Sequence, residues 1–122
     1  APPEKVEKII FCSGKLFYDL QHARAKMEDP GAAIIRIEQL YPLNTELLKK
    51  VVAPYSGFKE VVWCQEEPAN MGAWSFIRHP LEELLGERPY YAGREAAASP
   101  ATGSLAIHKI EQRRLIEAAL GN

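Results

Sequence analysis

The sequence predicts a single α/β domain built on a parallel or mostly parallel sheet that is covered by helices. Short runs rich in β-branched and aromatic residues alternate with longer segments whose apolar residues recur every three or four positions, which is typical of this class. The chain has 122 residues, of which 47% are hydrophobic. That length supplies one core of modest size, and it leaves no room for a second domain.

The first strand is predicted at KIIFC, Lys8–Cys12. Ser13 follows it and is expected to cap a helix, because a side-chain hydroxyl can accept a bond from a free N–H at a helix start. The apolar residues of that helix fall at spacings of four, three and four, which places them on one stripe; they are Leu16, Leu20, Ala23 and Met27. The Asp-Pro-Gly triplet at 29–31 ends the helix.

The second strand is predicted in AAIIRIEQL, from Ala32 to about Glu38 or Gln39. The Tyr-Pro pair at 41–42 then predicts a turn, and Asn44 is expected to cap a helix. The apolar residues of this helix are Leu47, Leu48, Val51 and Val52.

The third strand is predicted at EVVWCQ, Glu60–Gln65, and the fourth at RPYYAGR, Arg88–Arg94. The helix between them carries Trp74, Ile77, Leu81 and Leu84 on one stripe. Pro80 interrupts that stripe, so we expect a kink or two short helices near His79. After a loop at 95–103, Ser104 is expected to cap a last helix that ends near Leu120 and turns His108, Leu115 and Ala119 toward the core.

Composition excludes several classes of protein. The formal net charge of -1 does not favour nucleic-acid binding, and the apolar runs are shorter than the roughly 20 residues of a membrane span. The start, APPEKVEK, has no initiator Met and no signal-peptide pattern, so the chain is expected to be cut from something larger or processed. Cys12 and Cys64 are expected to be buried free thiols in a reducing compartment.

The stretch VVWCQEEPANMGAW, residues 61–74, is the strongest candidate for a functional site. Adjacent Glu66 and Glu67 would project to opposite faces of a strand, which is a poor arrangement for an acid and base pair. Pro68, Asn70 as a helix cap, and Gly72 beside Trp74 instead suggest a turn. We therefore interpret this stretch as a structural corner or interface rather than a reaction centre.

Two weaker readings stay open. CSGK, at 12–15, lies between a strand and a helix start and could receive an anion, although it lacks the spacing of a phosphate loop. Cys64 with Glu66 could form the nucleophile and base of a small hydrolase, although a cysteine inside an apolar strand is more often packed than reactive.

Several strings occur in an order and at spacings that resemble one family. They are CSGKLFYDL, IIRIEQLYPL, VVWCQEEPANMGAW, YYAGREAAASPATG and IHKIEQ, and they span about Val6 to Leu120. Together they closely resemble the C-terminal domain of the thiamine diphosphate-dependent, decarboxylating component of 2-oxoglutarate dehydrogenase. The resemblance implies a three-layer α/β/α, transketolase C-terminal-like fold around a mixed sheet of five strands. The first strand, antiparallel to the others, would be trimmed off or hidden before Glu7.

The resemblance implies an oxidoreductase of the tricarboxylic acid cycle that uses thiamine diphosphate and magnesium, with both cofactors and all catalytic residues in other domains. The isolated 122 residues are expected to be inactive. Within the parent enzyme they are expected to support a homodimer, which belongs to a multienzyme complex with succinyltransferase and dihydrolipoyl dehydrogenase components. No membrane partner is implied. The location would be the bacterial cytoplasm or the mitochondrial matrix.

The resemblance also suggests positions for contacts. Gln39 is the candidate residue for an allosteric nucleotide or acyl-CoA, and the candidate interface residues are Glu66, Glu67, Asn70, Gly72 and Trp74. The alternatives are a free-standing nucleotide or acyl-CoA binding module, and the corresponding domain of a 2-oxoadipate dehydrogenase.

Overall fold

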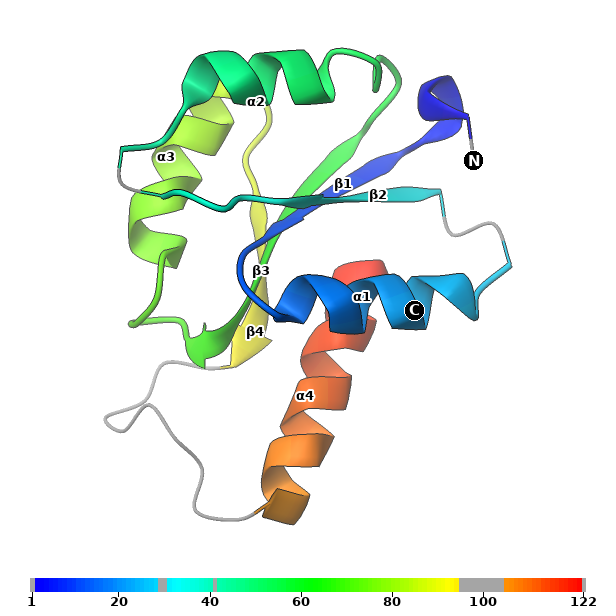
Figure 1. Cartoon of the computed structure of the whole chain (residues 1–122), viewed down its shortest axis with the longest axis vertical. Coiled ribbons are helices and arrows are strands. Elements are labelled where there is room, and N and C mark those ends of the chain that lie inside the picture. The colour runs from blue at the N-terminus through cyan, green and yellow to red at the C-terminus, as the bar shows by residue number, and fades with distance from the viewer. Residues whose placement is uncertain (1, 29–30, 41, 95–104, 122) are drawn as a thin grey trace.

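The computed structural model describes residues 2–28, 31–40, 42–94 and 105–121, with the side chains of 105–108 outside this description. Four parallel strands form one sheet in the order β2-β1-β3-β4. The strands are β1 (Lys8–Cys12), β2 (Ala32–Arg36), β3 (Glu60–Pro68) and β4 (Tyr90–Arg94). The helices are α1 (Leu16–Ala25), α2 (Thr45–Val52), α3 (Trp74–Leu85) and α4 (Leu105–Leu120), and a 3₁₀ turn η1 covers Pro3–Lys5 (Figure 1).

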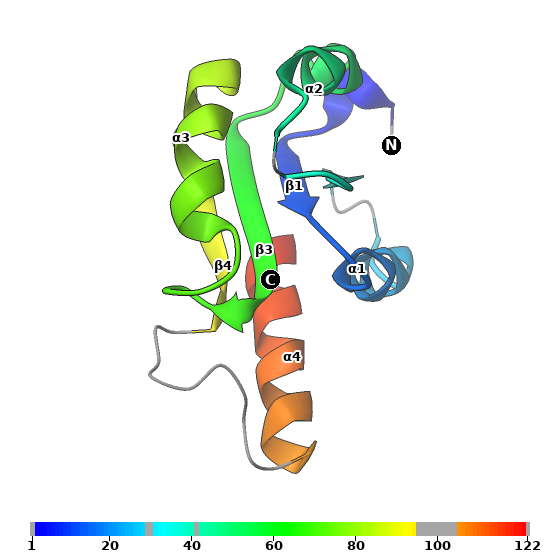
Figure 2. The same ribbon diagram turned by 60° about the vertical axis from the view of Figure 1, so that its left-hand side comes forward.

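Helices cover both faces of the sheet, so the fold has three layers. Successive side chains of a strand point to opposite faces, and β1 shows this alternation clearly. Ile10 and Cys12 pack with residues of α1 and α4 in one cluster, whereas Ile9 and Phe11 pack with residues of α2 and α3 in the other. In Figure 2, α1 and α3 lie on opposite sides of β3. The predicted α/β/α class is confirmed.

The central strands are the most completely buried part of the chain. All of Ile9 to Cys12 in β1 and Val61 to Gln65 in β3 are buried. Strands buried on both faces are expected to be continuously apolar, and the one polar residue in these runs is Gln65, which is 4% exposed. A buried amide in such a strand requires hydrogen-bond partners, and it directs attention to the end of β3.

Several predicted boundaries need correction. Strand β2 ends at Arg36 rather than near Glu38 or Gln39, because its neighbour β1 ends at Cys12, whose carbonyl accepts the last strand-like bond from the N–H of Ile37 at 2.8 Å. Strand β3 runs on to Pro68, and β4 begins at Tyr90 after the buried Pro89.

Two predicted caps are wrong and one is confirmed. The Asn44 side chain accepts a bond from the N–H of Leu47 at 3.0 Å and caps α2 as predicted. Neither Ser13 nor Asn70 caps a helix: α1 begins after Lys15 and α3 after Ala73, and no side chain caps either start. In both cases a glycine with positive φ, Gly14 or Gly72, makes the turn between the predicted cap and the helix.

Helix α3 is one continuous helix that contains Pro80, so two short helices are not formed. Ile77 and Leu81 are fully buried on either side of the proline and hold both halves of the helix on the sheet. Among the described residues there is no antiparallel fifth strand, and the segment before Glu7 forms η1 instead. Leu115 and Ala119 of α4 are buried as predicted, whereas Ser104 and the His108 side chain lie outside the described residues.

Candidate functional site

The end of β3 is organised around the buried amide of Gln65. Its Nε2 lies within hydrogen-bond distance of three main-chain carbonyls, those of Glu67 at 3.0 Å, Pro68 at 2.9 Å and Met71 at 2.8 Å, so its two hydrogens are shared among three acceptors. Its Oε1 accepts from the Trp63 indole Nε1–H at 2.8 Å and from the Trp74 main-chain N–H at 3.0 Å. This set uses the amide as donor and as acceptor. One side chain therefore fixes the path of the chain from the end of β3 to the start of α3.

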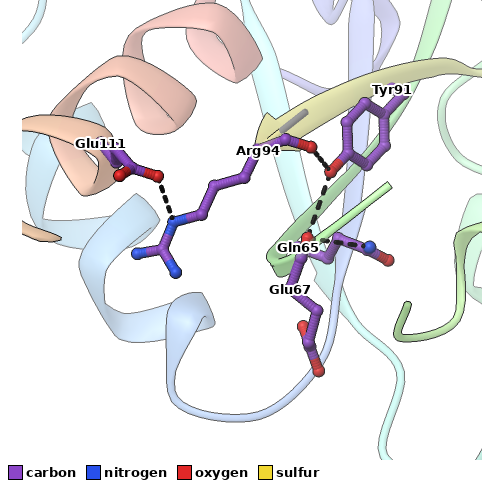
Figure 3. Close-up of polar contacts among 5 residues, drawn as sticks. All are labelled: Gln65, Glu67, Tyr91, Arg94 and Glu111. Carbon is purple, nitrogen blue, oxygen red and sulfur yellow. Dashed lines mark hydrogen bonds and ion pairs between the residues drawn. The ribbon is translucent and has the colours of Figure 1, made fainter. Parts of the chain in front are cut away.

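A second set of contacts ties this turn to β4 and α4 (Figure 3). The Tyr91 hydroxyl lies 3.1 Å from the carbonyl oxygen of Glu67 and also contacts the carbonyl oxygen of Arg94. The Arg94 Nε lies 3.2 Å from a carboxylate oxygen of Glu111 on α4. We call the residues Gln65 to Trp74, together with Tyr91 and Arg94, the corner. Side chains from three elements hold its shape.

Two glycines are required by this packing. Gly72 has φ +67°, and a Cβ at this position would lie 3.1 Å from the Gln65 side-chain amide atoms. A Cβ on Gly93 would lie 2.5 Å from the Tyr91 hydroxyl oxygen and 2.8 Å from the Gln65 carbonyl oxygen. The Gly93 separations are too short for a carbon atom, so only glycine allows the main chain of β4 to pass this close to β3. At Gly72 the positive φ disfavours any other residue, and a Cβ would require the Gln65 side chain to shift by a few tenths of an ångström.

The predicted interface residues all lie in the corner, but they differ in exposure. Glu67, Asn70 and Gly72 are exposed, whereas Glu66 and Trp74 are half-buried. Strand β3 does run through Glu66 and Glu67, but its pairing with β4 is irregular between Cys64 and Pro68, so the alternation of the two carboxylates stays a prediction. The arrangement places Glu67 outward, where it can meet a neighbouring protein surface. That these residues form an interface stays a prediction.

Gln39 is not one of the corner residues. It is exposed and follows the end of β2 by three residues, with Leu40 beside it packed against the core. Its role in binding a regulatory ligand stays a prediction.

Gln65, Tyr91 and Gly93 are the important residues that sequence reasoning missed. The signals were present: a lone amide in a buried strand requires partners, and a glycine inside a strand marks close approach of another part of the chain. The sequence does not show that the two features meet.

The two cysteines are free and fully buried on the same side of the sheet. Burial raises the pKa of the Cys12 thiol from its ordinary 9.0 to about 12, and burial also raises the pKa of the Cys64 thiol. The neighbouring Glu66 carboxylate adds to the rise at Cys64. A nucleophilic cysteine requires a stabilised thiolate and an open path to the substrate. The structure therefore argues against the hydrolase hypothesis for Cys64 with Glu66.

The buried thiols predict that the domain loses stability in alkaline solution. A group whose pKa is raised by folding binds its proton more tightly in the folded chain, so its contribution is complete below the unfolded-state pKa and is lost above it. For Cys12 this loss falls between pH 9 and about pH 12. Burial raises the pKa of Tyr91 from 10.0 to about 12, which adds to the loss in the upper part of that range.

Urea unfolding at several pH values measures this effect. The free energy of unfolding should fall as pH rises from 9 to 12 and should fall less steeply in Cys12→Ala, where one of the groups is gone. Equal slopes for the two proteins would contradict the assignment to Cys12.

Trp74→Ala is expected to lower the free energy of unfolding by about 1–2 kcal/mol, less than the removal of a fully buried ring. The ring is half-buried and packs against Tyr91 with centroids 5.4 Å apart, whereas the Trp74 N–H bond to Gln65 belongs to the main chain and survives the substitution. Urea midpoints of the two proteins provide the test. Equal midpoints would show that the ring contributes nothing within this domain.

Two features that the described residues lack bear on function. No three side chains among His, Cys, Asp and Glu gather into a group that could hold a metal ion within the described ranges. In the same part of the chain, no helix has the length and apolar content needed to cross a membrane.

Comparison with known proteins gives one family. The profile of the family described as 2-oxoglutarate dehydrogenase C-terminal matches residues 1–120. A 2-oxoglutarate dehydrogenase E1 component of Haemophilus influenzae is 46% identical over 120 residues, which cover 97% of this chain and 13% of that protein. The protein of the same name from Azotobacter vinelandii is 45% identical over 122 residues, covering 96% of this chain and 13% of the relative. The chain thus spans about 13% of the length of these relatives.

A solved structure supports the fold. The chain of a "Split gene transketolase, inactive beta4 tetramer" superposes with a TM-score of 0.61 at 20% identity, covering 96% of this chain and 39% of that one. At this identity the likeness concerns the fold alone, and it agrees with the transketolase-like architecture. With the family profile matched over residues 1–120, the chain belongs to the 2-oxoglutarate dehydrogenase C-terminal family.

Proposed function

We propose that this chain is the non-catalytic C-terminal domain of a 2-oxoglutarate dehydrogenase E1 component, and that it supports assembly of the enzyme. The observation that carries the proposal is the network around Gln65. Each of its five hydrogen bonds goes to another group of the same chain, and together they hold the shape of the corner. A rigid, outward-facing corner suits contact with a neighbouring domain or subunit.

The proposed parent reaction is the oxidative decarboxylation of 2-oxoglutarate with thiamine diphosphate and magnesium. The proposal places both cofactors in other domains of the parent enzyme and assigns no step of the reaction to residues of this chain.

The proposed partners are the other domains of the E1 component, a second copy in a homodimer, and the succinyltransferase and dihydrolipoyl dehydrogenase components. The side chains of the corner support contact with the other domains and with a second copy. Glu67 and Asn70 give it an exposed polar rim and Trp74 a partly exposed aromatic ring, a combination frequent at protein interfaces. The proposed location is the cytoplasm in a bacterium or the mitochondrial matrix in a eukaryote.

A chimera tests the proposed function. This chain would replace the matching C-terminal region of the Azotobacter vinelandii relative, with which it shares 45% identity. We expect the chimera to decarboxylate 2-oxoglutarate and to keep the mass of the native oligomer in light scattering. The same relative truncated before this region should lose both. A truncated protein that stays assembled and active would contradict the proposal.

A further inference from the structure

We draw no further inference here: the strongest candidate, the hollow between the outer edge of β4 and α4 that Gly93, Ile110 and Arg114 line, is an open and partly apolar face of the described chain, and nothing in the structure shows what covers it.

Discussion

Gln65→Leu is expected to lower the free energy of unfolding by about 3 kcal/mol or more, a large share of the stability of a small domain. Leucine fits a buried strand and has a similar size, but it removes five hydrogen bonds at once. The Trp63 indole N–H would then be buried without an acceptor, and the carbonyl of Met71 would lose the Gln65 donor, whereas the Pro68 carbonyl would keep the Met71 main-chain N–H. Unsatisfied buried groups account for most of the expected cost.

Two companion variants make this result specific to the amide. Gln65→Glu keeps acceptors for Trp63 and Trp74, but it has no hydrogen to donate to the three carbonyls, so it should also be strongly destabilised. Gln39→Leu changes an exposed glutamine and should leave the urea midpoint unchanged. A Gln65→Leu midpoint equal to that of the unmodified chain would contradict the assigned role of the amide.

Trp63→Ala is expected to cost about 3–5 kcal/mol, the range for removing a buried large aromatic ring. Trp63 is 1% exposed and fills the cluster between the sheet, α2 and α3, where its neighbours include Ile77 and Leu81. The substitution would leave a cavity in that layer and take the indole N–H from Gln65. Chemical denaturation followed by circular dichroism measures the loss.

Trp63→Phe separates packing from hydrogen bonding. Phenylalanine keeps most of the buried ring but has no N–H, so the expected loss is about 1–2 kcal/mol. Combined with Gln65→Leu, Trp63→Phe should cost less than the sum of the two single changes, because the lost bond is shared. Simple additivity would show that the contact between these side chains does not contribute.

The repeating elements of this fold are predictable from the sequence because each is dictated locally. Lys8–Cys12 is a short apolar run between polar ends, and Asn44 caps a helix through its own side chain. Boundaries that depend on another element are less predictable. Strand β2 ends where its neighbour β1 ends, which its own residues do not reveal.

The presence of a corner was predictable from the sequence, but the hydrogen bonds that hold its shape were not. The residues 61–74 indicated a structural corner, and the structure has a turn there, with Glu67 exposed and Glu66 half-buried. The network that holds it joins Gln65 to Trp74 across the turn and brings Tyr91 from another strand. Contacts between segments about 25 residues apart leave no periodic trace in a single sequence. The sequence also suggested Ser13 and Asn70 as helix caps. The positive-φ glycines Gly14 and Gly72 instead make the turns before α1 and α3.

We propose that the corner serves assembly and not chemistry, and its two acids provide the most direct test. In the Azotobacter vinelandii chimera, Glu66→Gln and Glu67→Gln together remove both carboxylates while keeping side-chain size. The measurement is kcat for 2-oxoglutarate decarboxylation, with the oligomer mass confirmed by light scattering. We expect a kcat close to that of the unmodified chimera. A fall of about 10²-fold or more at unchanged mass, the usual contribution of an acid or base catalyst, would contradict it.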